Sequence, residues 1–512
     1  SDDAVVTTVI FDSGVNGTVN LAAALGAGAS TLALQSAGTG TSDAVTVAHT
    51  NSADTFAGAA ITATGTETLN LTSTSTTSTG QTTGVITAVS GTTAVNFSGN
   101  NSFSVGAVTA GSINASGLTG TAALVQGAAA VGVTSITGSS NGDTLVGVAA
   151  AATTIYGGAG NDGITGGSAA DALHGEAGND VIVGGGGNDT ITGGDGNDTI
   201  TATTGSVSID GGAGNDVVNI GDSLTSGDVI NGGTGVNTLR ESVALIAPYA
   251  NVTNFQTLQL DGASLTQNMA NFTGNTFTRT DIAATGSQSL TNVGSAMQEL
   301  RIIDGTTLAS VALATDTSAD TLTIGAQTDA ATTVTGVTAN DIETMTVGAG
   351  ANTAVNNFEV TTLTDADLVT LNVTGNVNFV SALADQGATE VFTTLNAASN
   401  TGTVVFNASL QDITGITMTG SSTAANTLTG GSGNDVITGG SAADTLVGGS
   451  GNDYISGGSG SDNLSGGAGV DTLVAGVGSD MLTGGASGDG IVIGATAQTV
   501  NYAAATDTYS NA

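Results

Sequence analysis

The sequence predicts an all-β protein, an elongated β-solenoid that contains two parallel β-roll segments. Two observations support this prediction. Nine-residue units recur in register in two blocks, and repeats of fixed period are typical of solenoids. Outside the blocks, short stretches of alternating apolar and polar residues, rich in Thr and Val, favour strands. Gly, Asn, Asp and Ser separate these stretches as turns, and the 512 residues include only one Pro.

The composition excludes several classes of protein. The chain has 3 Lys plus Arg, all of them Arg, against 42 Asp plus Glu, and its net charge is −39. It therefore lacks the basic patch that binding to nucleic acid or to an anionic membrane surface requires. It has no Cys, which excludes disulfides and thiol catalysis. No run of 18 apolar residues is present, so the sequence predicts no membrane span.

The nine-residue units follow the pattern G-G-x-G-x-D-x-U-x, in which U is a large aliphatic residue. The first block begins at Gly157 and the second at Gly430. The sixth position holds Asp162, Asp171, Asp180, Asp189, Asp198 and Asp216 in the first block, and Asp435, Asp444, Asp453, Asp462, Asp471, Asp480 and Asp489 in the second. The eighth position holds Ile164, Leu173, Ile182, Ile191, Ile200 and Val218, then Ile437, Leu446, Ile455, Leu464, Leu473, Leu482 and Ile491. One intervening unit is degenerate, with Val207 in place of Asp.

Each unit reads as a six-residue turn followed by a three-residue strand, with the U side chain directed inward. Two units would form one coil, and coils would stack at about 4.8 Å. Stacking would place the Asp carboxylates in one row along each edge, where their mutual repulsion opposes folding. Calcium would relieve this repulsion, because it takes 6–8 oxygen ligands from carboxylates and carbonyls. The alternative is that Asp only forms Asx turns. Asn would do that equally well, yet Asn is common at the fifth position and Asp holds the sixth in every clean unit.

At these residues the chain resembles the RTX family of calcium-binding nonapeptide repeats. The resemblance implies calcium between the turns of a β-roll, held by the Asp carboxylates above and by carbonyl groups of the glycine loops. Carried onto this chain, those carbonyls belong to Gly158, Gly160, Gly178, Gly185, Gly187, Gly194, Gly196, Gly212, Gly214, Gly431, Gly433, Gly449, Gly451, Gly458, Gly460, Gly467 and Gly469. The pattern has departures: residues 166–171 and 439–444 have Ala at the fourth position, and Glu176 replaces a Gly.

We expect five segments along the chain. They are a Thr/Ala/Gly-rich β domain (1–140), the first calcium β-roll (141–240), a β-rich solenoid-like domain (241–425), the second calcium β-roll (426–495) and a C-terminal tail (496–512). In the third segment a loose strand motif recurs around Leu258, Leu300, Met345 and Leu371, at irregular spacings. Short helices are expected at 21–26, 287–300 and 380–385. The short tail leads us to expect a fragment of a longer protein.

Catalytic constellations are not found. A zinc protease needs a helical His pair with Glu, but the two His, His49 and His174, are far apart and outside any HExxH motif. No G-x-S-x-G occurs in the strand-to-helix setting of a lipase. Paired carboxylates of a glycosidase would usually be accompanied by aromatic platforms, and the chain has no Trp and five Tyr. We therefore expect a protein that is not an enzyme.

The combination resembles the RTX-containing bacterial surface-layer (S-layer) proteins of the Caulobacter type. That resemblance implies type I secretion, localisation at the bacterial cell surface and calcium-dependent self-assembly into a two-dimensional lattice outside the outer membrane. The expected partner is a second copy of the chain, with attachment to lipopolysaccharide through a region not in this chain. The alternatives are an RTX adhesin or cell-surface binding module and, third, a secreted RTX hydrolase. An adhesin would stay monomeric in calcium, whereas a lattice protein would form sheets.

Overall fold

A computed structural model describes most of the chain, and the structural statements below concern these residues only. They are 8–11, 17–21, 31–36, 43–49, 60–64, 66–74, 93–106, 108–127, 132–202, 204–221, 224–225, 227–243, 249–262, 265–283, 287–294, 297, 299–302, 307–313, 320–326, 332–334, 337–340, 342–349, 356–364, 367–384, 391–411, 415–494, 499–501 and 508–511.

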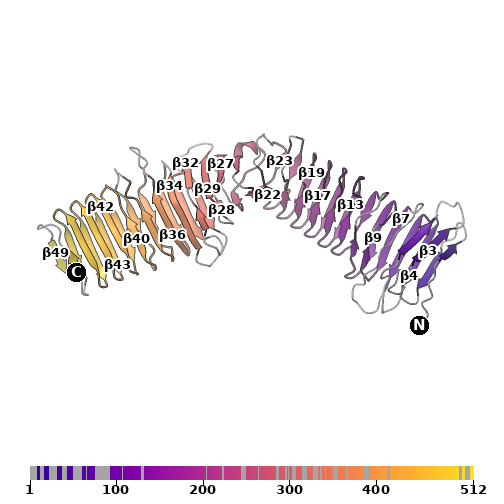
Figure 1. Cartoon of the computed structure of the whole chain (residues 1–512), viewed down its shortest axis with the longest axis horizontal. Helices are drawn as coiled ribbons and strands as arrows, with labels where there is room; N and C mark the ends of the chain where they lie inside the picture. The colour runs from indigo at the N-terminus through magenta and orange to yellow at the C-terminus, as the bar shows by residue number, and fades with distance from the viewer. Residues whose placement is uncertain are drawn as a thin grey trace. The chain divides into compact units, whose positions relative to one another are not determined.

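The fold is a parallel β-solenoid, which confirms the predicted fold class. The chain divides into two compact units, one of Ser1–Arg240 with Tyr249–Phe255 and one of Glu241–Pro248 with Gln256–Ala512. In each unit the chain alternates between two sheets, and neighbouring strands within a sheet are parallel (Figure 1). Each unit contains one of the two repeat blocks.

The first unit has two long sheets and one short one. One long sheet contains β2 (Gly17–Leu21), β4 (Ala44–His49), β6 (Thr68–Ser73), β7 (Ala94–Gly99), β9 (Ser112–Leu118), β11 (Ser135–Thr137), β13 (Thr154–Ala159), β15 (Ala172–Ala177), β17 (Thr190–Asp195), β19 (Ser208–Ala213), β21 (Val229–Asn231) and β23 (Val252–Thr253). The opposite sheet contains β8 (Phe103–Val105), β10 (Leu124–Gln126), β12 (Thr144–Val146), β14 (Gly163–Thr165), β16 (Val181–Val183), β18 (Thr199–Thr201), β20 (Val217–Asn219) and β22 (Thr238–Glu241). The short sheet contains β1 (Thr8–Phe11), β3 (Thr31–Ser36) and β5 (Ala60–Thr64).

The second unit has two long sheets. One contains β24 (Thr257–Leu260), β26 (Arg279–Ile282), β28 (Glu299–Ile302), β30 (Thr321–Ala326), β33 (Thr344–Ala349), β35 (Thr370–Thr374), β37 (Thr394–Asn396), β39 (Thr417–Thr419), β41 (Val436–Gly440), β43 (Tyr454–Ser459), β45 (Thr472–Val477), β47 (Gly490–Ile493) and β49 (Thr508–Asn511). The other contains β25 (Thr266–Asn268), β27 (Ser287–Val293), β29 (Thr307–Leu313), β32 (Val337–Asn340), β34 (Asn356–Thr364), β36 (Val377–Leu383), β38 (Val404–Asn407), β40 (Asn426–Thr429), β42 (Thr445–Ser450), β44 (Asn463–Ala468), β46 (Met481–Ala486) and β48 (Thr499–Asn501). The strand β31 (Thr332–Val334) pairs with β34, and η1 (Met269–Asn271) is a 3-10 helix.

The length of a coil distinguishes the repeat blocks from the rest of the solenoid. Within the blocks, register partners lie two repeat units apart, as in Ile155 with Leu173 or Leu446 with Leu464. Two nine-residue units therefore form one coil, as the sequence predicted. Outside the blocks the coils are longer and unequal, as the pairing of Leu371 with Leu395 shows. Because the backbone ladder tolerates loops of different length, the strands remain in register while the sequence period becomes irregular.

The core of each block is a ladder of eighth-position side chains. Ile164, Ile182, Ile200 and Val218 are register partners, and each is at most 1% exposed. The same holds in the second block for Ile437, Ile455, Leu473 and Ile491. The longer coils instead bury Phe, and pairs such as Phe97 with Phe103 have ring centroids 4.9 Å apart. Parallel strands covered on the inner face by branched aliphatics are stabilised mainly by this burial.

Two of the expected helices are wrong. Residues 287–300 contain β27 and the start of β28, and residues 380–383 belong to β36. Their Ala-, Leu- and Gln-containing patterns pack as strands, because the neighbouring coils supply ladder partners that outweigh local propensity. Residues 22–26 of the third expected helix lie outside the described residues. Where the chain is described, no helix is long and apolar enough to cross a membrane.

Some strands of the repeat blocks are longer than the sequence predicted. The sequence predicted three-residue strands after each turn, and this holds for β14, β16, β18 and β20. In β13, β15, β17 and β19, and in β42 to β46, the strand continues for six residues into the first residues of the next unit. Glycine can continue a pleated ladder, so the boundary between turn and strand is not fixed by composition.

We expect Leu464→Ala in the middle of β44 to destabilise the calcium-loaded protein by about 2–5 kcal/mol, because it leaves a cavity between Leu446 and Leu482. The measurement is urea unfolding followed by circular dichroism. Exposed Asn463→Ala on the same strand is the control, with an expected change within about 0.5 kcal/mol. Equal effects of the two substitutions would contradict the inward direction of the eighth position.

Candidate metal centre

The sixth-position Asp residues form four stacked rows. Two rows lie in the first block and two in the second, and successive members of a row are one coil of 18 residues apart. Row 1 contains Asp162, Asp180, Asp198 and Asp216; row 2, Asp171 and Asp189; row 3, Asp435, Asp453, Asp471 and Asp489; and row 4, Asp444, Asp462 and Asp480. All thirteen are at most 3% exposed. Each block thus carries two lines of buried carboxylates.

One oxygen of each carboxylate is held by the preceding coil. In row 1, Oδ1 of Asp180 accepts a hydrogen bond from the backbone N–H of Asp162 at 2.7 Å, and Oδ1 of Asp198 accepts from Asp180 at 2.8 Å. In row 3, Asp453 accepts from Asp435 at 2.8 Å in the same way. This bond fixes the carboxylate in the inward direction at the turn, and the sequence motif alone did not indicate it.

The second oxygen has no such partner in most of the row members. Oδ2 is buried without a hydrogen bond in Asp162, Asp180, Asp189, Asp198, Asp216, Asp453, Asp462 and Asp471. An orphaned carboxylate oxygen is costly because burial removes its water without replacing it. In Asp171 and Asp435, Oδ2 instead accepts from the N–H of Gly167 and Gly431. The rows therefore hold negative charge that the protein itself does not neutralise.

Burial and the charge of neighbouring Asp residues raise the pKa of the carboxyl groups of Asp162, Asp198, Asp453 and Asp462. Desolvation is the main cause, and it raises the pKa of Asp162 and Asp453 to about 7 and that of Asp198 and Asp462 to about 6. The hydrogen bond from the preceding coil lowers each pKa, and the charge of the neighbouring Asp in the row raises it. The repulsion expected from the sequence is thus present in the folded rows.

First-position glycines leave the space in which Oδ2 lies. A Cβ on Gly193 would approach both Oδ2 of Asp198 and the carbonyl oxygen of Gly211, one coil on, to less than 3.0 Å. Gly448 faces Oδ2 of Asp453 and the carbonyl of Gly466 in the same way. Two acceptors therefore face the same small space. The predicted ligand set named carbonyls of the second and fourth positions only, so the first-position carbonyls are an addition from the structure.

The predicted glycines of the second and fourth positions form rows of their own. In most of them, the carbonyl oxygen of the glycine lies against the glycine of the following coil. These are Gly160, Gly178, Gly187, Gly194, Gly196, Gly212, Gly214, Gly431, Gly433, Gly449, Gly451, Gly458, Gly460 and Gly467. Gly158, Gly185 and Gly469 face the carbonyl of the coil before them. At Gly178, φ is 130° and a Cβ would meet the carbonyl oxygen of Gly160, so no other residue fits. These carbonyl rows run beside the Asp rows.

The departures from the pattern are accommodated in two ways. Glu176 adopts φ 74° in place of a second-position glycine, a conformation that is uncommon for a side-chain-bearing residue. Ala169 and Ala442 do not take positive φ, although the equivalent Gly187 and Gly460 do. The loops at 166–171 and 439–444 therefore have a different backbone from clean loops such as 184–189 and 457–462.

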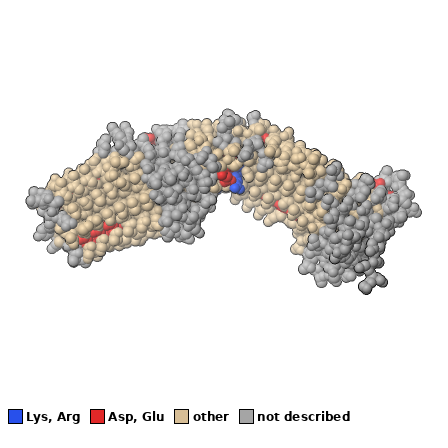
Figure 2. All heavy atoms as spheres, viewed as in Figure 1, with Lys and Arg blue, Asp and Glu red and all other residues tan. Residues whose placement is uncertain are grey.

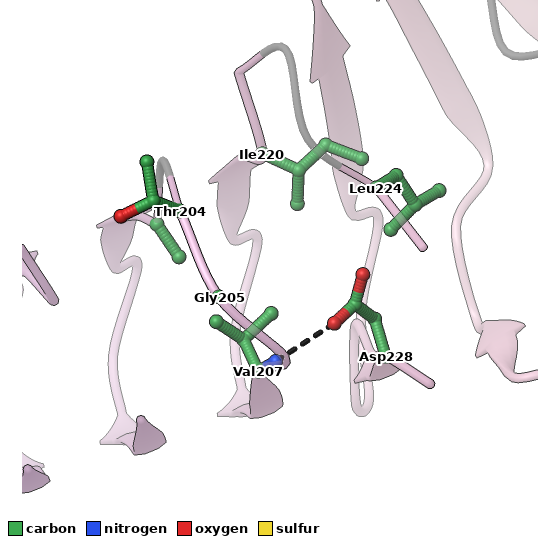
Figure 3. A pocket seen from close by; sticks show the side chains of 7 residues that line it. Thr204, Gly205, Val207, Ile220, Leu224 and Asp228 are labelled. Atoms are coloured by element: carbon green, nitrogen blue, oxygen red, sulfur yellow. Dashed lines mark hydrogen bonds between the residues drawn. The ribbon is translucent and has the colours of Figure 1, made fainter. Parts of the chain in front are cut away.

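Two Asp residues of the turn rows, Asp143 and Asp228, were not among the predicted site residues. Asp143 precedes row 1, and its Oδ1 accepts from the N–H of Leu124. Asp228 lies in a small pocket beside Val207, Ile220 and Leu224, and its carboxylate accepts from the N–H of Val207 at 2.8 Å (Figure 3). The G-D-x-U fragments at 142–145 and 227–230 are the signals that could have found them.

Fifth-position asparagines form a further ladder on the surface. Oδ1 of Asn161 accepts from the N–H of Asn179 at 2.8 Å, and Asn434 accepts from Asn452 at 2.7 Å. The Asn ladder ties each turn to the following coil, whereas the Asp bond ties it to the preceding one. This explains the frequent Asn beside each Asp, which the sequence analysis noted without a role.

The residues present suit a hard divalent cation. In turns such as those of Asp198 and Asp453, the polar atoms that face the turn space are carboxylate and carbonyl oxygens, and calcium binds such oxygens in sets of 6–8. Among the described residues no three His, Cys, Asp or Glu side chains cluster as a metal site. Any ligand set at the rows would thus have to combine side-chain and backbone oxygens.

Comparison with known proteins agrees with this chemistry. The family model of the RTX calcium-binding nonapeptide repeat matches residues 154–173, 165–200, 192–222, 421–455 and 456–491. The chain therefore contains RTX repeats, and RTX nonapeptide repeats bind calcium. No curated protein matches the chain. The matched residues coincide with the four Asp rows.

We expect low pH to restore part of the β structure of the protein when calcium has been removed. In the folded, metal-free rows the pKa is about 7 for Asp162 and Asp453 and about 6 for Asp198 and Asp462, above the ordinary value of 3.8. Protonation therefore favours the fold at low pH, and this stabilisation is lost as the pH rises through 6–7. The measurement is circular dichroism in chelator between pH 8 and pH 5. A signal that does not change over this range would contradict buried, repelling rows.

Gly448→Ala should weaken calcium-dependent folding of the second block. The new methyl group would overlap Oδ2 of Asp453 and the carbonyl of Gly466, at a cost of about 1–3 kcal/mol. The calcium concentration that half-restores the β signal should rise by about fivefold or more. Gly490→Ala is the matched control, because its nearest neighbour would be 3.7 Å away. Equal calcium midpoints for both variants would show that the first-position space is not part of the site.

Proposed function

We propose that this chain is a calcium-dependent structural protein of a bacterial surface layer, secreted by a type I system and assembled into a two-dimensional lattice outside the outer membrane. The observation that carries the proposal is the set of buried Asp rows, in which Oδ2 of members such as Asp162, Asp198 and Asp453 has no hydrogen bond within the fold. RTX repeat proteins are typically secreted, and an all-β RTX solenoid is typical of structural proteins.

The rows supply a switch between the two sides of the cell envelope. Calcium sites of extracellular modules fill at about 10⁻⁴–10⁻³ M, far above the free calcium of a cell interior. Inside, the row carboxylates repel and oppose coil stacking, which keeps the chain open for export. Outside, ion binding to the stacked coils alone converts binding energy into folding energy. The first coil to stack also positions oxygen ligands for the next coil.

Neutralisation of the rows also favours contact between copies. The chain has a net charge of −39, so two copies repel, and each bound divalent ion removes two units of that charge. On the face drawn in Figure 2, the described surface has few charged side chains: a line of acidic atoms over the C-terminal coils, one small group of both signs and several isolated acidic atoms. Val436 and Tyr454, register partners in β41 and β43, add exposed apolar surface. A nearly uncharged sheet face suits packing against another copy.

We expect millimolar calcium to convert the protein into ordered sheets that dissolve when the calcium is chelated. Negative-stain electron microscopy with and without calcium, beside circular dichroism, makes the measurement. Single particles that gain β structure with calcium but do not associate would contradict the lattice role and favour an RTX adhesin. Hydrolysis of an ester, peptide or glycan by the loaded protein would favour a secreted hydrolase.

A further inference from the structure

Two of the four Asp rows end at an asparagine. Asn237 follows Asp216 at the end of row 1, and Asn426 precedes Asp444 at the start of row 4. Both occupy the sixth position of their turns and are at most 2% exposed. An asparagine has the shape of an aspartate with one carboxylate oxygen replaced by an NH2 donor. These two turns therefore have an amide side chain at the position where the other turns of their rows have a carboxylate.

Within row 1, the turn of Asp198 brings two acceptors together. Oδ2 of Asp198 and the carbonyl oxygen of Gly211 both lie within 3.0 Å of the point where a Cβ on Gly193 would be. A carbonyl oxygen and an ionised carboxylate oxygen cannot donate, and Oδ2 of Asp198 has no hydrogen bond. Such a pair needs a positive charge or a donor between its members.

At Asn237 the same space contains a donor. Nδ2 of Asn237 and the carbonyl oxygen of Asn254 lie within 3.0 Å of the Cβ position of Gly232, as Asp198 and Gly211 do at Gly193. Here Nδ2 donates to that carbonyl at 3.1 Å, while Oδ1 accepts from the N–H of Asp216 at 2.9 Å, as the Asp residues do from theirs. The change from oxygen to NH2 converts a repulsive contact into a hydrogen bond.

At the start of row 4, the side chain of Asn426 makes more hydrogen bonds within its turn than Asn237 does. Its Oδ1 accepts from the N–H of Ser421 at 2.7 Å. Its Nδ2 lies within hydrogen-bond distance of three oxygens, the carbonyls of Ser421 and Ala424 at 3.1 Å and Oδ1 of Asp444 at 2.9 Å. These are carbonyl and carboxylate oxygens, the same kinds that the interior turns direct at one another.

We propose that Asn237 and Asn426 close the ends of rows 1 and 4 by replacing a cation with an amide donor, so that the turns they occupy fold without metal. The inference rests on the proposed binding of calcium by the Asp rows. In a solenoid each coil is stabilised by its neighbours. A turn that is complete without calcium therefore gives the first calcium-dependent turn, at Asp444 or Asp216, a preformed surface on which to stack.

The test converts the amide into a carboxylate in the full-length chain. We expect Asn426→Asp to bind one more calcium ion per chain than the unaltered protein, measured by equilibrium dialysis with calcium. In chelator, hydrogen exchange of residues 415–429 should become faster than in the unaltered protein, because the new carboxylate repels Asp444. A purely structural role for Asn426 would also speed exchange but would not add an ion.

Asn434→Asp is the matched control. Asn434 lies on the following turn at the fifth position, and its Oδ1 accepts from the N–H of Asn452 at 2.7 Å, which a carboxylate can also do. The substitution adds the same charge nearby, and the number of bound ions should not change. An equal gain in both variants would overturn the inference, because charge alone and not the sixth position would then explain it.

The outcomes separate this inference from the proposed function. If the unaltered chain binds calcium and Asn426→Asp gains none, the inference is wrong and calcium binding by the rows stands. If the unaltered chain binds no calcium, the proposed function fails as well. If Asn426→Asp does not fold, the inference can be tested by the reverse change, Asp453→Asn. It should lose bound calcium yet slow the exchange of residues 448–466 in chelator, and faster exchange there would overturn the inference.

Discussion

The β-roll coils depend on the neutralisation of buried carboxylates that recur every coil. Burial of the eighth-position aliphatics stabilises the stack. The same stacking buries each Asp close to the charge of its neighbours. The raised pKa of Asp162 and Asp453 reflects the unfavourable free energy of these buried charges. Since the ladder bonds satisfy only one oxygen of each carboxylate, the fold and the charge are opposed until an external cation or a proton joins the row.

The other residues of the repeat follow from this constraint. First-position glycines leave space for Oδ2 and a facing carbonyl, and second- and fourth-position glycines let carbonyl rows approach the next coil. Fifth-position asparagines tie the turns together on the surface without adding charge. Asn237 and Asn426 end rows 1 and 4 with an internal donor. One electrostatic requirement thus accounts for most of the recurring positions of the unit.

Much of the repeat architecture could be predicted from the sequence, because a strict period of nine determines coil length, inward positions and the placement of Asp162 or Asp453. The longer coils were harder. Two coils separate Leu258 from Leu300, whereas a single coil separates Met345 from Leu371, and no fixed period expresses such loops. Segment 287–300 was misread as helix for the same reason. The roles of Asn426 and Gly448 depend on contacts between coils, which a single unit does not contain.

The most direct test of the account is a crystal structure grown in calcium, with an anomalous difference map that locates the ions. We expect peaks in the turns between successive coils, beside Oδ2 of row members such as Asp198 and Asp453. We expect none in the turns that Asn237 and Asn426 complete. Well-ordered Asp rows without anomalous peaks would contradict the claim that cations hold the β-rolls together.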